Sequence, residues 1–255
     1  MNIEPTVWLP YCGVAPDPAE WLWRWNLDPL LLAAVAAGAM GLVMLRRSRG
    51  EGSAGAQAGL ILLIVLLFVS PLCALGSSLF IARVVHHVIL ATLVAGCVVL
   101  ATGLQRRSIA GSLPLWTALQ ALVFWAWHAP PLYAAALSSD ALFWLMQLSI
   151  TGSAALWWAK LRQAPAGAAV VALLATMVLM GVLGALITFA GRPLYAPHLL
   201  TTQAWGLTPL EDQQIAGILM WAPASAIYLL SAMAILYRSL GSDPAARPAI
   251  PAARA

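Results

Sequence analysis

The four histidines of this 255-residue chain all lie at or near the ends of apolar stretches. His86 and His87 are adjacent, His128 stands two residues before Pro130, and His198 lies in a long polar link. Neutral imidazole binds copper and other first-row metals, and it exchanges protons near neutral pH. These four positions are therefore candidate sites for metal binding or proton handling.

Segment 80–91, FIARVVHHVILA, predicts a helix that carries Arg83 and His87 on one face, because they are four residues apart. His86 is offset from His87 by about 100° around a helix. We therefore expect only one of the two to point into a pocket, while the other faces a loop or lipid headgroups. The alternative is an interfacial histidine beside an arginine that extends toward water, and for His86 this alternative is favoured.

Segment 124–137, FWAWHAPPLYAAAL, places His128 on the last turn of a predicted helix, directly after Trp127. A helix C-terminus favours an imidazolium by its dipole, and tryptophans gather at membrane interfaces. His128 and Trp127 therefore belong either to a functional site or to an interfacial belt, and both interpretations stay open.

His198 follows Tyr195 closely in the link 191–213. Links of this length in a compact bundle are often functional, so both residues are candidates. The opposing interpretation is that a histidine in a loop is simply solvated.

The end of the same link predicts a helix start. Thr208 and Glu211 have the spacing of a capping box, in which each side chain bonds the backbone of the other residue. Asp212 has no task in that box, so we expect it to be free at the surface to bind metal or a partner.

Seven uncharged apolar stretches predict membrane-spanning helices, since about 20 apolar residues cross the core of a bilayer. The chain has 62% hydrophobic and 9% charged residues, a composition that is also more apolar than that of soluble proteins. We predict an all-α integral membrane protein, a seven-transmembrane helix bundle of 29–237, with an outer N-terminal segment 1–28 and a disordered cytoplasmic tail 238–255. The predicted spans are 29–45, 59–75, 84–104, 113–128, 141–159, 168–190 and 214–237.

Lysine and arginine gather in alternate links, and cytoplasmic links carry the excess of positive charge. This pattern predicts an outer N-terminus, a cytoplasmic C-terminus and histidines near the outer side. The net charge of +4 thus reflects topology and does not indicate a nucleic-acid partner. The basic residues of the cytoplasmic links are Arg46, Arg47, Arg49, Arg106, Arg107, Lys160, Arg162, Arg238, Arg247 and Arg254.

The composition of the spans argues against several classes of membrane protein. None of the seven contains Asp, Glu, Lys or Arg, which ion pumps and proton relays use near the midplane. The last span has no lysine for a retinal Schiff base, and no internal repeat typical of many transporters is found.

A few residues predict local packing. Pro71 and Pro223 lie within spans, where proline kinks a helix. Cys12 and Cys73 lie on the predicted outer side, where they form a disulfide, act as soft ligands for Cu(I), or pack as free thiols. Close helix packing is expected at Gly38, Gly41, Gly152, Gly181 and Gly184.

Four short segments, taken in order and spacing, resemble the multi-span CtaG-type family of cytochrome c oxidase assembly proteins. The resemblance covers most of 26–237 and implies a seven-span inner-membrane protein that helps to mature a haem-copper oxidase, by delivering copper to it. By this resemblance His87, His128 and Asp212 match residues of the family's motifs. The segments are WNLDPLLL at 25–32, ARVVHHVILATLVA at 82–95, WHAPPLYAAAL at 127–137 and LTPLEDQQIAGILMW at 207–221.

Three positions depart from the family pattern. Arg83 stands where the family commonly has a histidine, and Phe143 and Gln147 stand where it commonly has a histidine pair. Arginine is not a metal ligand, whereas copper needs several N or S donors. The chain therefore uses a reduced site, recruits other ligands such as Cys12, His86 or His198, or has lost copper binding.

We thus expect a non-enzymatic assembly factor of the bacterial inner membrane whose outer-face histidines hold copper transiently. The expected partners are cytochrome c oxidase subunits, a periplasmic copper donor and the lipid bilayer. The alternative is a haem-binding or quinone-linked redox membrane protein in which histidines serve as axial ligands.

Overall fold

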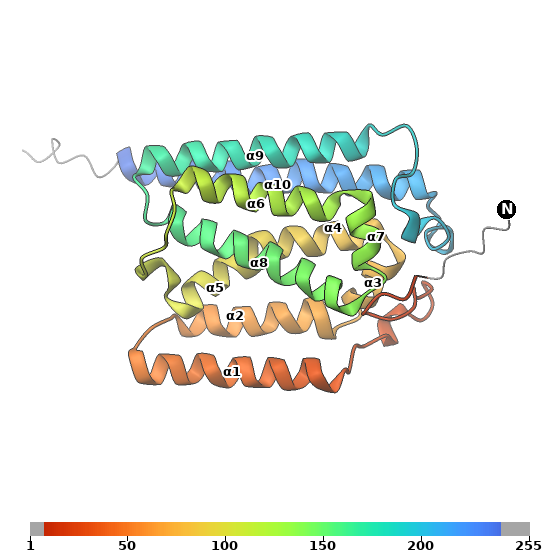
Figure 1. Cartoon of the computed structure of the whole chain (residues 1–255), viewed down its shortest axis with the longest axis horizontal. Helices are drawn as coiled ribbons and strands as arrows, with labels where there is room; N and C mark the ends of the chain where they lie inside the picture. Colours follow the sequence, from red (N-terminus) through yellow and green to blue (C-terminus); the bar gives the residue numbers. More distant parts are fainter. Residues whose placement is uncertain (1–7, 241–255) are drawn as a thin grey trace, which may run out of the picture.

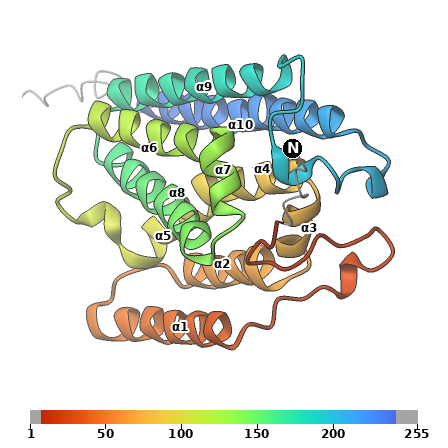
Figure 2. The same cartoon turned by 45° about the vertical axis from the view of Figure 1, so that its right-hand side comes forward.

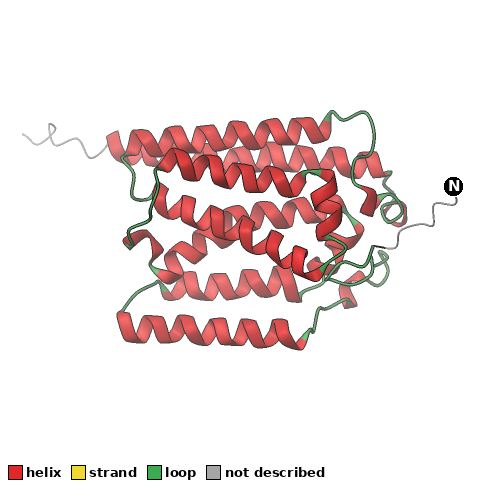
Figure 3. Ribbon diagram, in the orientation of Figure 1, coloured by secondary structure: helices red, strands yellow, loops and turns green. Residues whose placement is uncertain are grey.

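The computed structural model describes residues 8–240. The predicted tail therefore lies almost entirely outside the described residues, as do residues 1–7 of the N-terminal segment. Within 8–240 the chain forms helices and no strand, which confirms the all-α prediction (Figure 3). The α-helices are α1 (Pro29–Arg49), α2 (Ala54–Ile64), α3 (Leu72–Ser78), α4 (Phe80–Ile89), α5 (Ala95–Thr102), α6 (Leu113–His128), α7 (Pro130–Ala136), α8 (Asp140–Leu161), α9 (Ala166–Thr188) and α10 (Pro209–Leu240).

Shorter helical pieces complete the chain. Two π-helical segments interrupt long helices: η2 (Val65–Val69) extends α2, and η3 (Leu90–Val94) joins α4 to α5. The 3₁₀ turns are η1 (Trp21–Trp23), η4 (Leu104–Arg106), η5 (Ala196–His198) and η6 (Gln203–Trp205).

Four helical runs are long and apolar enough to cross a membrane, namely α1, the run Phe80–Thr102, α9 and α10. The bent pair of Ala54–Val69 and α3 is a fifth if it counts as one span. These match five of the predicted spans. The other two correspond to α6 and α8, which run alongside the others in the same bundle (Figure 1), and the count of seven spans stays a prediction.

Helix ends follow the local sequence. Asp28 caps α1, since its carboxylate accepts the Leu30 N–H at 2.9 Å, and Pro29 occupies the first helical position. The predicted capping box opens α10: the Thr208 N–H donates to Glu211 at 2.8 Å, and the Glu211 N–H donates to the Thr208 hydroxyl at 3.2 Å. The predicted capping box is confirmed, and α1 begins at residue 29, where the first predicted span begins.

Proline has different effects in two helices. At Pro71 the chain bends by 43° between η2 and α3, because proline has no N–H to continue the helical ladder. Around Pro223, by contrast, α10 continues as one helix. The predicted kink is therefore confirmed at Pro71, and at Pro223 it stays a prediction.

Glycines allow close packing between α9 and α10. A Cβ added at Gly184 would lie 2.8 Å from the Gly217 carbonyl oxygen, so only glycine permits this approach. Gly181 contacts Trp221 in the same interface. The prediction was wrong for Gly38, Gly41 and Gly152, because an added Cβ would meet no described atom within 4 Å. Two of these lie on α1, which stands at the edge of the bundle and has few neighbours (Figure 1).

The two ends of the bundle differ in composition. One end, here named the histidine end, gathers α3, α7, the start of α4, the end of α6 and the link between α9 and α10 (Figures 1 and 2). The opposite end, named the basic end, holds the last turns of α1, α8 and α10 with their lysine and arginine residues. The N-terminal segment packs on the histidine end, where Cys12 and Cys73 form a disulfide.

Candidate functional site

Two histidines from different helices meet at the histidine end. His87 Nδ1 of α4 lies 3.3 Å from His128 Nε2, and His128 Nδ1 lies 2.7 Å from the Phe124 carbonyl oxygen. A carbonyl only accepts, so His128 Nδ1 must carry the proton, and its Nε2 must accept from His87. The His87 proton is then on Nδ1, and His87 Nε2 keeps a lone pair that has no partner within residues 8–240. This pair therefore has one imidazole nitrogen, His87 Nε2, whose lone pair is free to bind a ligand.

Arg83 lies one turn before His87 and is fully buried, which excludes an arginine extended toward water. Its guanidinium carbon is 5.2 Å from the Phe143 ring centre, a cation–π distance. The Tyr133 hydroxyl is close enough to act on its charge. None of the guanidinium nitrogens has a well-formed hydrogen bond among the described residues. A Cβ at Gly76 would lie 2.9 Å from the guanidinium, so a larger residue there would displace the Arg83 side chain.

The expectation that only one of the two adjacent histidines faces the bundle was wrong. His86 is 3% exposed and His87 is 0% exposed. His86 packs edge-on against Phe68 of η2, with ring centres 4.9 Å apart. The reason is that α4 lies inside the bundle, so both of its sides meet other helices. His86 Nε2, like His87 Nε2, has no hydrogen-bond partner in the described part of the chain.

Asp212 is not free at the surface, as the sequence had suggested, but is fully buried. Its two carboxylate oxygens accept the N–H groups of Phe80 at 2.7 Å and Ile81 at 3.1 Å. These groups begin α4, and a helix N-terminus offers unpaired donors and a favourable dipole for a carboxylate. Asp212 on α10 therefore caps the helix that carries the two adjacent histidines.

His198 is buried and not solvated. Its Nδ1 donates to the Ser78 carbonyl oxygen at 3.3 Å, and its Nε2 accepts from the Tyr133 hydroxyl at 2.6 Å. Burial lowers the pKa of His198 to about 3, although the bond to Ser78 acts in the opposite direction. Both ring nitrogens are thus occupied in a neutral ring, which makes His198 a structural residue in this arrangement.

The remaining two candidates hold helix α6 in place. The Tyr195 hydroxyl donates to the His128 carbonyl oxygen at 2.8 Å, and burial raises the pKa of Tyr195, so the hydroxyl stays protonated. The Trp127 indole N–H donates to the Ser149 hydroxyl of α8 at 2.8 Å. Both residues therefore position His128, and neither has a spare group directed at His87.

Of the three departures from the family pattern, Arg83 and Phe143 are in contact one turn from His87. Phe143 and Gln147 are one turn apart on α8, both are buried, and Phe143 lies under Arg83. Both amide atoms of Gln147 lack a partner within residues 8–240. Sequence reasoning missed Tyr133, which bonds His198 and stacks edge-on with Phe80. Its place in the WHAPPLY segment was the available signal.

The described part of the chain does not offer a complete ligand set for a metal ion. Among residues 8–240 there is no group of three or more His, Cys, Asp or Glu able to hold a metal. The cluster supplies the His87–His128 pair and a free Nε2 on His86. The buried Arg83 charge, one turn from His87, disfavours any added cation. The disulfide between Cys12 and Cys73 uses both of those sulfurs, so the predicted soft-ligand alternative does not apply in this state.

Comparison with known proteins gives a family for this bundle. Among curated proteins and among solved structures the chain matches none. Residues 39–242 match one protein family along most of the chain, including every helix from α2 to α10. That match covers the His87–His128 pair, the Arg83 departure and the Asp212 cap together. The chain therefore belongs to the family of cytochrome c oxidase caa3 assembly factors.

Proposed function

We propose that this protein helps to mature a haem-copper cytochrome c oxidase in the bacterial inner membrane, by passing copper at the periplasmic face. The family supports the coarser part of this proposal, association with a cytochrome c oxidase. The observation that carries the finer part is the His87–His128 contact, which leaves a buried imidazole lone pair at one end of the bundle.

The disulfide supports a periplasmic position for the histidine end. Disulfides persist in the periplasm and are rare in the cytosol. Cys12 and Cys73 are paired at the histidine end, and the basic residues gather at the opposite end, as cytoplasmic residues do. Reporter fusions test the orientation: fusions after residues 50, 110 and 164 should report the cytoplasm, and fusions after 78, 138 and 200 the periplasm.

Arg83 explains why binding would be transient. Cu(I) is a cation, and a buried guanidinium one turn from His87 repels it. Within residues 8–240 no carboxylate forms an ion pair with Arg83, since the ion pair found there joins Arg107 to Glu51 and the buried Asp212 carboxylate bonds the backbone of α4. A carrier must release its metal, so this repulsion favours transfer over retention. The partner that removes copper would be an oxidase subunit docked at the histidine end.

The proposal is tested by Cu(I) competition with a chelator, using the full chain purified in detergent. Wild type should bind copper weakly, and His128→Gln should lose binding while His198→Gln keeps it. Arg83→His removes the repelling charge and adds a donor, so we expect at least about tenfold tighter binding, which corresponds to about 1.4 kcal/mol. Equal copper binding by wild type and His128→Gln would contradict the assignment.

A cellular test addresses the function apart from the site. In cells that lack this protein, the oxidase polypeptide should accumulate with little copper, and added copper should partly restore activity by mass action. An oxidase with full copper content in such cells would exclude copper delivery.

Haem is a poorer occupant of the same pair. Axial coordination by two histidines needs a porphyrin between the rings, whereas His87 and His128 are in direct contact at 3.3 Å. That contact leaves no gap for a porphyrin plane.

A further inference from the structure

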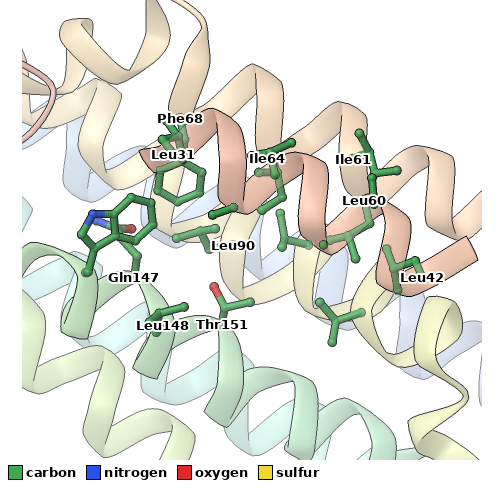
Figure 4. A pocket seen from close by; sticks show the side chains of 17 residues that line it. Leu31, Leu42, Leu60, Ile61, Ile64, Phe68, Leu90, Gln147, Leu148 and Thr151 are labelled. Carbon is green, nitrogen blue, oxygen red and sulfur yellow. The ribbon is translucent and has the colours of Figure 1, made fainter. Parts of the chain in front are cut away.

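A separate cavity lies on the other side of Phe68, between the peripheral helix α1 and the rest of the bundle. Its volume is about 440 Å³, within the usual range for small-molecule sites. Its walls come from α1, α2, η2, η3, α5 and α8, and most are aliphatic. Figure 4 shows Gln147, Leu148 and Thr151 of α8 on one side, across from Leu60, Ile61 and Ile64 of α2.

One polar side chain in this wall has no partner. Gln147 is 1% exposed and lines the cavity, and neither its amide oxygen nor its amide nitrogen makes a hydrogen bond among the described residues. A buried amide without partners is costly, whereas a ligand with a polar group would satisfy it. The amide needs both an acceptor and a donor, or one group that exchanges between the two roles.

The charge of the wall restricts the ligand. The lining contains no Asp, Glu, Lys, Arg or His among the residues that the structure describes. An anionic molecule such as a fatty acid, or a haem with its propionates, would therefore have no counter-charge here. The ligand that fits is electrically neutral.

The depth of Gln147 and the shape of the cavity restrict the ligand further. Gln147 lies seven residues after the exposed Asp140 that begins α8, which is about 10 Å along a helix at 1.5 Å per residue. The ester groups of a phospholipid stay at the interface, so they do not reach Gln147. Beside Gln147, Phe68 and Trp144 stack with ring centres 5.2 Å apart, which favours a planar ring.

The backbone around the cavity is also unusual. Both π-helical segments contribute to its wall, with Phe68 from η2 and Leu90 and Val94 from η3. Such π segments are rare and often occur at functional sites. They widen two helices at the point where the planar head of a ligand would lie.

We propose that this cavity binds a membrane-dissolved quinone. The neutral ring would pack against Trp144 and Phe68, and the flexible tail would follow the aliphatic groove between α1 and α2. The Gln147 amide nitrogen donates to a quinone carbonyl, and its amide oxygen accepts from the hydroxyl of the reduced form. One side chain thus matches both redox states of the same ligand.

The test measures binding of a decyl-substituted benzoquinone to the full chain in detergent by calorimetry, with decylbenzene as the tail-matched probe without carbonyls. The quinone should bind more tightly than decylbenzene. Gln147→Leu should weaken quinone binding about three- to tenfold, the value of one net hydrogen bond, and leave decylbenzene unchanged. Gln120→Leu is the control, since Gln120 is a buried glutamine bonded to Thr176 outside this cavity.

A second pair of variants tests the location. Gly38 lines the cavity and Gly41 does not, and an added Cβ meets no described atom within 4 Å at either position. Gly38→Leu should therefore fill the cavity and reduce quinone binding at least about tenfold, whereas Gly41→Leu should bind like wild type. Equal binding by these two variants, equal binding of quinone and decylbenzene, or no saturable quinone binding would each overturn the proposal.

Discussion

Two buried histidine contacts at the histidine end differ in how completely their ring nitrogens are used. His198 bonds Tyr133 and Ser78, so both of its nitrogens are occupied. His87 bonds only His128, and its second nitrogen has no partner in residues 8–240. Because an unpaired buried polar atom costs free energy, the first contact is explained by stability alone. The second requires another explanation, and the proposed copper transfer would supply one.

The largest expected effect is on oxidase activity, which should distinguish the His87–His128 contact from the His198 contact. His128→Gln should lower oxidase activity about tenfold or more, as loss of groups at a metal site does, while the amount of protein in the membrane stays near wild type. His198→Gln should lower the amount of protein and keep the activity per molecule. If both variants reduce activity only in proportion to abundance, the comparison fails and both contacts are structural.

A smaller effect concerns the second contact, His87–His128, which Asp212 of α10 supports by capping α4. Asp212→Ala removes a buried carboxylate that accepts two N–H groups of α4, so we expect the free energy of unfolding to fall by about 2 kcal/mol. Thr208→Ala removes an exposed cap and should cost about 1 kcal/mol. Chemical unfolding in detergent gives both values. A loss of activity by Asp212→Asn at normal stability would instead assign Asp212 a chemical role.

The third effect is a pH dependence of the first contact, that of His198 with Tyr133 and Ser78. The pKa of His198 is lowered from 6.5 to about 3 in the folded protein, so the unfolded chain binds the proton more readily. Its contribution to stability is therefore complete above about pH 6.5 and is lost as the pH falls toward 3. The melting temperature of wild type should fall across this pH window by more than that of His198→Gln. If the melting temperatures of the two proteins depend on pH in the same way, protonation of His198 does not contribute to the loss of stability.

Much of the architecture could be predicted from the sequence, because helix formation depends on neighbouring residues. The first predicted span begins at residue 29, as α1 does, and the predicted Thr208–Glu211 capping box is found in the structure. Apolar stretches gave the positions of all the long helices, and the histidines were correctly expected near one end. Helix faces were predicted less well: the outcome for His86 depended on which helices surround α4.

Partners far apart in the sequence could not be predicted in this way. Asp212 bonds the backbone of Phe80, 132 residues away, and His198 bonds Ser78, 120 residues away. Nothing in the capping box indicates that the carboxylate next to it caps a second helix. The pairing of Cys12 with Cys73 was one of three open alternatives until the N-terminal segment was placed against α3.

The sequence by itself determined the class of protein, the approximate positions of the long helices and the family, because hydropathy, capping and short motifs act over a few residues. The tertiary structure alone decided which imidazole keeps a free lone pair and which is satisfied. It also decided that Gln147 faces an apolar cavity. The physical reason is that hydrogen-bond satisfaction depends on distances of about 3 Å between atoms of different helices, and only the packing of the bundle sets those distances.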